Sequence, residues 1–220
     1  MNDSLILSYV DHTMLTATAS WDEIKQMCED GIKYNTATVC VPPCYVKRVR
    51  AAYPNLRLGS VAGFPLGFTS LAVKSLEVHA LVEEGIDEID MVINLTDVKN
   101  GDFDSVKTEL SVLKQIMGTK ILKVIIETCY LTEEEKIMMC KVVTEAGADY
   151  IKTSTGTAAA GATMHDIELF KAHVGPNVKI KAAGGIRSRE DMVAYIEAGC
   201  SRLGTSSALK VLAGGSAGSY

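Results

Sequence analysis

One short pattern occurs three times in the chain and decides its fold. The pattern is Ala146-Gly147-Ala148-Asp149-Tyr150-Ile151-Lys152, and its two other copies are residues 84–90 and 198–204. In each copy a glycine ends a stretch with helical spacing, because a residue without Cβ adopts the left-handed conformation there at little cost. Asp90, Lys152 and Gly204 follow at the same offset, so we expect them at similar depths along three strands. Short helix–strand loops are common, however, and similar offsets alone leave this depth open.

The whole chain alternates between short runs rich in Val, Ile and Leu and longer stretches with helical spacing. The eight expected strands are Leu5–Val10, Ala37–Val41, Leu58–Ala62, Glu88–Ile93, Leu122–Ile126, Tyr150–Thr153, Val178–Ala182 and Arg202–Gly204. The expected helices include Trp21–Asp30, Thr69–Glu84, Thr132–Ala146, Asp166–His173 and Arg189–Ala198. Parallel strands need crossover helices, and an open doubly wound sheet usually has fewer strands. The predicted fold class is α/β, a (β/α)8 TIM barrel in a single domain over residues 1–212, with a flexible tail over residues 213–220.

Length, charge and composition exclude several classes of protein. The chain has 220 residues and a formal net charge of −5, whereas a nucleic-acid-binding surface is normally basic. No apolar run reaches the roughly 18 residues of a membrane span, and the N-terminus lacks the pattern of a signal peptide. Six scattered cysteines fit reduced thiols, and four separated histidines do not suggest a metal site. We therefore expect a cytoplasmic protein that binds neither nucleic acid nor membranes.

Ionisable residues interrupt strands that should be apolar. A parallel strand covered on both faces carries a charge only where that charge is paired or used. The residues concerned are Asp90, Lys123, Glu127, Lys152, Lys179 and Lys181. Because most of them fall late in neighbouring strands, we expect a polar site at the C-terminal mouth of the barrel, where barrel enzymes place their chemistry. A purely structural cluster of buried ion pairs is the alternative.

Two of these lysines indicate a specific chemistry. Lys152 and Lys181 fall on the adjacent sixth and seventh strands, so one ammonium can lower the pKa of the other. A neutral lysine amine attacks a carbonyl to form an imine, which then serves as an electron sink. Asp90 would pair with the lysine that stays charged and pass protons through water. This set of residues fits reversible carbon–carbon bond chemistry without a metal or cofactor.

A second signal lies in the last two loops. Gly184 and Gly185 follow the seventh strand, and Ser206 and Ser207 follow the eighth. Exposed backbone amides and a helix N-terminus bind phosphate, and barrels often place a phosphate site after these two strands. The alternative is that a serine only caps the last helix. We expect a phosphorylated small molecule as the substrate.

At these residues the sequence resembles the 2-deoxyribose-5-phosphate aldolases, a family of Schiff-base (class I) aldolases. The matching segments are Asp11–Thr13, Gly63–Gly67, Asp87–Asn94, Lys123–Thr128, Tyr150–Gly156 and Lys181–Arg187. They occur in family order along nearly the whole chain. The resemblance implies a (β/α)8 barrel that cleaves 2-deoxyribose 5-phosphate to acetaldehyde and glyceraldehyde 3-phosphate. Members are often dimers, so it also leaves a homodimer as the expected assembly.

The resemblance also implies catalytic roles for individual residues. Lys152 would form the Schiff base, and Asp90 and Lys181 would relay protons during dehydration of the carbinolamine and formation of the enamine. Some members end in a tyrosine that assists proton transfer at the enamine carbon, which makes Tyr220 a candidate. A Gly/Ser tail of seven residues reaches on the order of 15 Å, enough to approach the barrel mouth. An incidental terminal tyrosine is the alternative.

The substrate-binding residues that the resemblance implies are Gly184, Gly185, Ser206, Ser207, Thr153 and Cys40. For Cys40 we favour the plainer interpretation as a core thiol. The chain departs from the family at Thr157, where some members carry a lysine that helps to neutralise the phosphate. This departure puts the strength of the phosphate preference in doubt, and Arg187 is the residue able to supply charge instead.

Three other functions remain open at this stage. Another Schiff-base barrel aldolase or a transaldolase would act on a related phosphosugar, and a transaldolase would ignore acetaldehyde. A phosphosugar isomerase would use a carboxylate base and form no covalent adduct. A binding protein without catalytic activity would hold phosphosugars and release no aldehyde.

Overall fold

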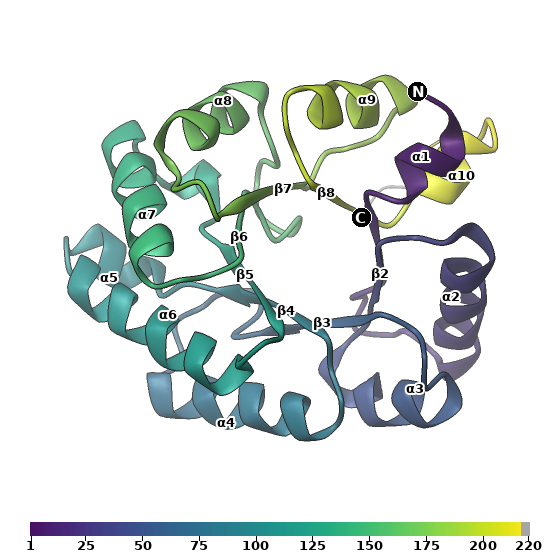
Figure 1. Ribbon diagram of the computed structural model, residues 1–220, viewed down its shortest axis with the longest axis horizontal. Helices are drawn as coiled ribbons and strands as arrows, with labels where there is room; N and C mark the ends of the chain where they lie inside the picture. Colours follow the sequence, from purple (N-terminus) through teal and green to yellow (C-terminus); the bar gives the residue numbers. More distant parts are fainter. Residues whose placement is uncertain (217–220) are drawn as a thin grey trace.

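The computed structural model describes residues 1–216, which form a closed barrel of parallel strands surrounded by helices (Figure 1). The strands are β1 (Val10–Thr13), β2 (Thr38–Cys40), β3 (Leu58–Ala62), β4 (Glu88–Val92), β5 (Ile121–Ile125), β6 (Tyr150–Lys152), β7 (Lys179–Ala183) and β8 (Arg202–Thr205). They follow one another around the barrel in chain order, and β8 pairs with β1 to close it. The predicted (β/α)8 barrel is confirmed.

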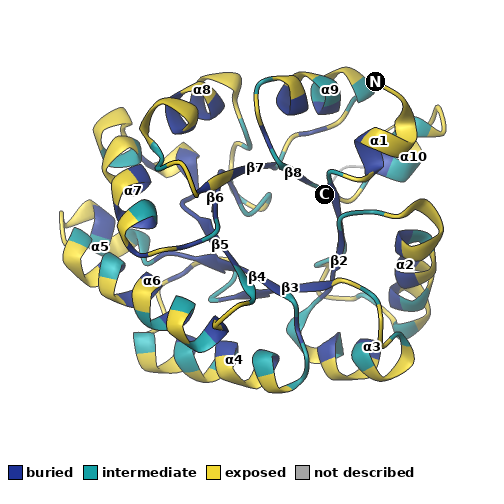
Figure 2. Ribbon diagram, in the orientation of Figure 1, coloured by how far each residue is buried: buried dark blue, intermediate teal, exposed yellow. Residues whose placement is uncertain are grey.

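The helices lie outside the barrel and bury their inner faces against it, which Figure 2 shows as dark blue stripes facing the strands. They are α1 (Asp3–Leu7), α2 (Trp21–Tyr34), α3 (Val46–Ala52), α4 (Leu71–Glu83), α5 (Leu95–Lys99), α6 (Phe103–Met117), α7 (Glu133–Glu145), α8 (Met164–His173), α9 (Arg189–Glu197) and α10 (Ala208–Leu212), with 3-10 turns η1 (Pro43–Tyr45) and η2 (Thr128–Tyr130). The apolar core fills the layer between strands and helices. Within the described residues, no helix is long and apolar enough to span a membrane.

The first predicted strand is wrong. Residues 5–9 are not in a strand: the chain begins with α1, whose N-terminus is capped by the Asn2 side chain accepting from the Leu5 N–H at 2.9 Å. Ile6 and Leu7 are both buried from this single helical turn, and α1 packs beside α10 (Figure 1). A short apolar run does not distinguish a strand from a buried helix end. The strand starts only at Val10, which places Asp11 inside β1.

The glycine pattern of the three copies has the conformation that the sequence predicts. Gly85, Gly147 and Gly199 all have positive φ, at 88°, 73° and 112°. In the third copy the missing side chain of Gly204 also makes room, because a Cβ there would lie 3.1 Å from Cε of Lys181. The spacing therefore brings the residue five positions after each glycine to the barrel interior.

Alternation along the strands gives the barrel a charged interior and an apolar exterior. In β4, Ile89 and Met91 belong to the apolar core, whereas Glu88 and Asp90 take part in buried ion pairs. Barrel interiors are ordinarily filled by branched apolar side chains. Here the strands carry the polar site themselves. The predicted tail follows α10, and Tyr220 lies outside the described residues, so the tail and the role of Tyr220 stay predictions.

Candidate active site

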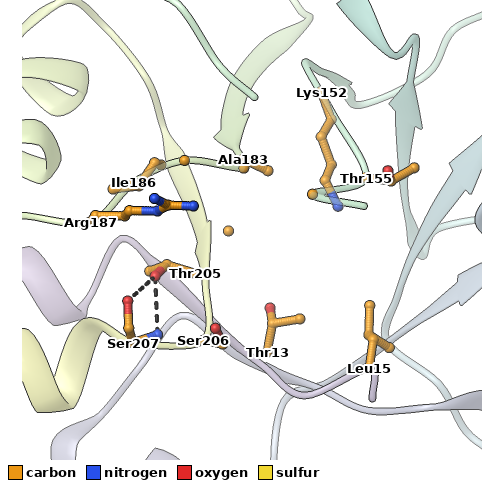
Figure 3. Close-up of a pocket in the computed structure, with 14 residues that line it drawn as sticks. Thr13, Leu15, Lys152, Thr155, Ala183, Ile186, Arg187, Thr205, Ser206 and Ser207 are labelled. Atoms are coloured by element: carbon orange, nitrogen blue, oxygen red, sulfur yellow. Dashed lines mark hydrogen bonds between the residues drawn. The ribbon is translucent and has the colours of Figure 1, made fainter. Parts of the chain in front are cut away.

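Lys152 ends β6 and points into a pocket at the mouth of the barrel (Figure 3). Only 5% of the residue is exposed, yet it is part of the pocket wall. Its Nζ donates to Oδ2 of Asp90 at 2.6 Å, which is its one ion pair among the described residues. Lys152 thus presents an amine to the pocket while the rest of the side chain is buried.

The three residues predicted to carry the chemistry meet at one oxygen atom. Oδ2 of Asp90 accepts from Nζ of Lys152 and from Nζ of Lys181, each at 2.6 Å. Asp90 and Lys181 are each 1% exposed and lie behind Lys152, outside the pocket wall. A proton can therefore pass between the two lysines over one shared carboxylate.

The surroundings separate the two lysines in basicity. Burial lowers the pKa of Lys152; the Asp90 charge opposes this, and the Lys181 charge lowers the pKa further. Burial alone would also lower the pKa of Lys181, but the charges of Asp11 and Asp90 outweigh it and raise the value. Lys181 therefore keeps its proton, and Lys152 is the lysine that gives up its proton more readily. The first is suited to act as an acid and the second as a nucleophile.

A second layer of charge lies beneath these residues. Asp11 accepts from Nζ of Lys181 and, at 2.7 Å, from Nη1 of Arg202. Arg202 also donates to both oxygens of Glu88, at 2.8 and 3.0 Å. Nζ of Lys123 lies 2.6 Å from Glu88 and 2.9 Å from Asp90. We call this the interior ion-pair network; its members are Asp11, Glu88, Asp90, Lys123, Lys152, Lys181 and Arg202.

The carboxylates of the network stabilise the charged form of every base more than burial destabilises it, except at Lys152. The three carboxylates face four bases, and all seven side chains are buried. Burial opposes the charged form of every base, but the carboxylates raise the pKa of Lys123, Lys181 and Arg202 above their ordinary values. Among the four bases of the network, Lys152 alone has a lowered pKa. The charge balance of the barrel interior thus favours one neutral amine, at the position that faces the pocket.

Sequence reasoning assigned no role to Asp11, Glu88 or Arg202. Asp11 was placed after the first strand because that strand was expected too early. Arg202 and Glu88 stand at the starts of β8 and β4, where a charge is easily taken for a solvated strand end. The sequence signal that could have identified these residues is a charged residue at either end of an apolar strand. Lys179 shows its weakness, since it lies on the same face of β7 as Lys181 and is nevertheless exposed.

Replacing Arg202 by methionine is expected to lower the free energy of unfolding by about 3–5 kcal/mol, because it leaves a buried carboxylate short of its bidentate partner. Arg57 provides a matched control: its Nε also approaches Glu88, at 3.3 Å, but its side chain is 59% exposed. Arg57→Met should cost at most about 1 kcal/mol. Urea unfolding with linear extrapolation measures both. Equal losses in the two variants would contradict the assignment of the buried pair as the dominant one.

The predicted phosphate-binding residues line the same pocket as Lys152. Gly184 and Gly185 both have positive φ, at 79° and 77°, and form one wall together with Ser206 and Ser207. Arg187 also lines the pocket, and Figure 3 shows its guanidinium on the side opposite Lys152. The pocket therefore holds an amine on one side and a guanidinium on the other, and glycine backbone lines it as well. Thr13 and Leu15 also line the pocket, and neither was predicted as a site residue.

Three further residues from the sequence lie away from this wall. Thr153 is fully buried, and its Oγ1 donates to the Ala183 carbonyl at 3.0 Å, which ties β6 to β7. Cys40 is 3% exposed, and burial together with the Asp90 charge raises the pKa of its thiol to about 12. Thr157 is exposed and pairs with Thr155, Oγ1 to Oγ1, at 2.9 Å. None of the three is part of the pocket wall, so a role in substrate binding stays a prediction for Thr153 and Cys40.

A parallel barrel with a buried, deprotonatable lysine at its mouth, backed by a carboxylate and a second lysine, defines a barrel aldolase. Comparison with known proteins agrees. The family profile described as DeoC/LacD family aldolase matches residues 5–218, and the chain belongs to this family.

Relatives and solved structures match over nearly the full length. A deoxyribose-phosphate aldolase of Clostridium botulinum (strain Eklund 17B / Type B) is 57% identical over 215 residues, which cover 97% of both chains. A structure described as QR15, an aldolase, has a TM-score of 0.91 at 36% identity and covers 95% of both chains. The deoxyribose phosphate aldolase of Aeropyrum pernix, described as a unique tetramer, has a TM-score of 0.89 at 29% identity, with 96% of this chain and 91% of that chain covered. The resemblance seen in the sequence is thereby confirmed.

Proposed function

We propose that the chain is a class I aldolase that reversibly cleaves 2-deoxy-D-ribose 5-phosphate to acetaldehyde and D-glyceraldehyde 3-phosphate, in the breakdown of deoxyribose phosphates. One observation carries the proposal. The Lys152 amine, with its lowered pKa, stands in a pocket that Gly184 and Gly185 also line and that has Arg187 on the side opposite Lys152. An aldehyde and a phosphate at opposite ends of one small molecule match these two sides of the pocket. The relatives named above carry the same activity in their names.

The proposed reaction begins with attack of the neutral Lys152 amine on the aldehyde carbon of the open-chain sugar. The resulting carbinolamine loses water when its hydroxyl receives a proton that comes from Lys181, and an iminium ion remains. The C3 hydroxyl then gives its proton back through water to the Asp90–Lys181 pair, the C2–C3 bond breaks, and the electrons of that bond move into the iminium to give an enamine. Glyceraldehyde 3-phosphate leaves. Protonation of the enamine at C2 and hydrolysis then release acetaldehyde and restore the amine.

Asp90 and Lys181, which lie behind Lys152, carry out the proton transfers. Asp90 touches both lysines, so we assign it the transfer of protons between Lys181 and the carbinolamine, with water as the carrier. The surrounding lysines hold the pKa of Asp90 well below its ordinary value against the effect of burial. As a persistent carboxylate, Asp90 stabilises the iminium that forms on Lys152.

The test of this function is borohydride reduction in the presence of acetaldehyde, followed by peptide mass mapping. An aldolase of this kind gives a reduced ethyl adduct on Lys152 and releases acetaldehyde from 2-deoxyribose 5-phosphate. A transaldolase would give no adduct with acetaldehyde. An isomerase would convert phosphosugars without any adduct, and a binding protein would do neither. Each of these three results would contradict the proposal.

The phosphate end of the pocket gives a separate prediction. Ser206→Asp should raise KM for the phosphorylated sugar by roughly tenfold or more, because a fixed negative charge would face the phosphate. KM for free 2-deoxyribose should change much less, and Ser206→Asn, which has the same size without the charge, should change neither strongly. Steady-state kinetics with both sugars measure this. Equal effects of the aspartate on both substrates would place the phosphate elsewhere.

We also propose that the enzyme works in the cytoplasm as a homodimer. All six cysteines are free thiols, as is usual in a reducing compartment. Large apolar side chains remain exposed in the middle of α4, at Leu76, and in the loop before it, at Leu66 and Phe68. Such side chains are commonly covered by association between copies of a chain.

A further inference from the structure

Glu127 combines burial with an unusual backbone conformation at the mouth of the barrel. It is the second residue after β5, has a φ of 49°, and is 2% exposed. A residue other than glycine in this left-handed region costs of order 1–3 kcal/mol and persists where the surroundings enforce it. Such positions cluster at functional sites, so the contacts of Glu127 bear on the pocket nearby.

The carboxylate of Glu127 has one kind of partner, the backbone of the next loop. Both of its oxygens lie 3.2 Å from the N–H of Thr155, which donates to them. Among residues 1–216, Glu127 forms no ion pair, and burial raises the pKa of its carboxyl group. An unpaired buried carboxyl is costly, and an apolar side chain would fill the same space without that cost. The contact with Thr155 is therefore what distinguishes Glu127 from a core residue.

A backbone contact supports the same connection. The N–H of Thr128 donates to the Thr153 carbonyl at 2.9 Å. With the turn at Glu127, the end of β5 thus holds the chain after β6 at two points, one through backbone and one through the side chain. Lys152 lies directly before the first of them, at residue 153.

The loop held by Glu127 lines the pocket and also packs on the glycine turn after β7. Thr155 and Gly156 line the pocket beside Lys152. Further along, the loop packs on the turn after β7: the Ala162 N–H donates to the carbonyls of Ala183 and Gly184, both at 3.1 Å. A Cβ at Gly161 would lie 2.2 Å from the Gly184 carbonyl oxygen. Residues 155–162 therefore form a brace between the end of β5 and the glycine turn.

We propose that Glu127 is a positioning residue, which fixes residues 155–162 and through them the Gly184–Gly185 turn in the place that receives the phosphate-bearing end of the substrate. This inference rests on the proposed aldolase function. Glu127 forms no ion pair with the lysines of the interior ion-pair network and does not line the pocket, although the Lys152 charge is near enough to lower the pKa of its carboxyl group against the effect of burial. Its loss should therefore weaken binding of the phosphorylated sugar and leave imine formation at Lys152 intact.

The test compares Glu127→Leu with Glu127→Gln, since glutamine keeps an oxygen that accepts from Thr155 and leucine does not. Leucine should raise KM for 2-deoxyribose 5-phosphate by about tenfold or more, with kcat changed less, as expected for a buried hydrogen bond lost. KM for free 2-deoxyribose should change by less, and borohydride trapping with acetaldehyde should persist. Glutamine should stay within about threefold of the native enzyme. Glu168→Leu, the same change at an exposed position of α8, is the control.

A second variant acts at the other end of the brace. Gly161→Ala should also raise KM selectively for the phosphorylated sugar, and its effect should be less than additive with that of Glu127→Leu. It replaces Glu127→Leu as the test if the leucine variant does not fold. Equal rises for both sugars, or full additivity, would overturn the proposal, as would loss of trapping at Lys152. A native enzyme that forms the adduct yet does not cleave 2-deoxyribose 5-phosphate would instead contradict the proposed function.

Discussion

Lys152→Ala is expected to abolish both turnover and borohydride trapping, because it removes the only amine that faces the pocket within the described residues. Lys152→Arg should do no better, since guanidinium stays protonated and cannot attack a carbonyl. Each variant removes the covalent route altogether, so the loss of kcat should be the largest of any single substitution in the chain. Cleavage of 2-deoxyribose 5-phosphate, followed as acetaldehyde release, measures it.

The control for this result is a measurement of whether both variants remain folded. Lys152 has one ion pair, with Asp90, which keeps Lys123 and Lys181 as partners when Lys152 is lost. Both variants should therefore still unfold in urea in one transition with nearly the native slope, at a lower midpoint because a buried side chain is changed. In the native enzyme the labelled peptide must contain residue 152. An adduct on any other lysine, or residual trapping in Lys152→Ala, would refute the assignment.

Lys181→Leu is expected to lower kcat by about a hundredfold or more and to move the pH optimum upward. The rate falls because the acid of the carbinolamine step is lost, an effect typical of general acid–base catalysis. The direction of the pH shift follows from the charges. The Lys181 ammonium lowers the pKa of Lys152, so its removal lets that pKa rise. A higher pH is then needed to produce the neutral amine.

Asp90→Asn is expected to shift the pH profile in the opposite direction. The Asp90 carboxylate raises the pKa of Lys152 against the effect of burial, so its loss should lower that pKa and move the acidic limb of the pH profile downward. The rate should still fall strongly, because asparagine lacks the carboxylate that links Lys152 to Lys181 and passes protons between them. Profiles of kcat against pH for both variants measure these two shifts. Near-native rates, or shifts in the same direction, would contradict the relay.

The sequence predicted the barrel well because the signals for it are local. Hydrophobic runs of strand length alternate with helical spacing, and a glycine ends several helices, so eight units can be counted without tertiary information. The one wrong strand, at residues 5–10, fails for the same reason. Whether Ile6 and Leu7 are buried from a helix or from a strand depends on what covers them, and that is α10 and the barrel, far along the chain.

The site was predicted in part. Asp90, Lys152 and Lys181 stand out because ionisable residues interrupt apolar strands. The role of Glu127 was not predicted, since its burial and its backbone conformation appear only once the loop after β6 lies across it. Arg187 was a candidate whose side chain the sequence left unplaced, and the structure puts it in the pocket wall.

Sequence by itself determined the fold, the order of the strands and the three ionisable residues that meet at the barrel mouth. Only the tertiary structure shows which charges surround each of the two lysines. A period of two says which side chains share a strand face, but the pairing of strands sets which charges meet inside the closed barrel. Asp11 comes from β1 and lies against Lys181 of β7 because β8 closes on β1. That contact keeps Lys181 charged and leaves the neutral amine to Lys152.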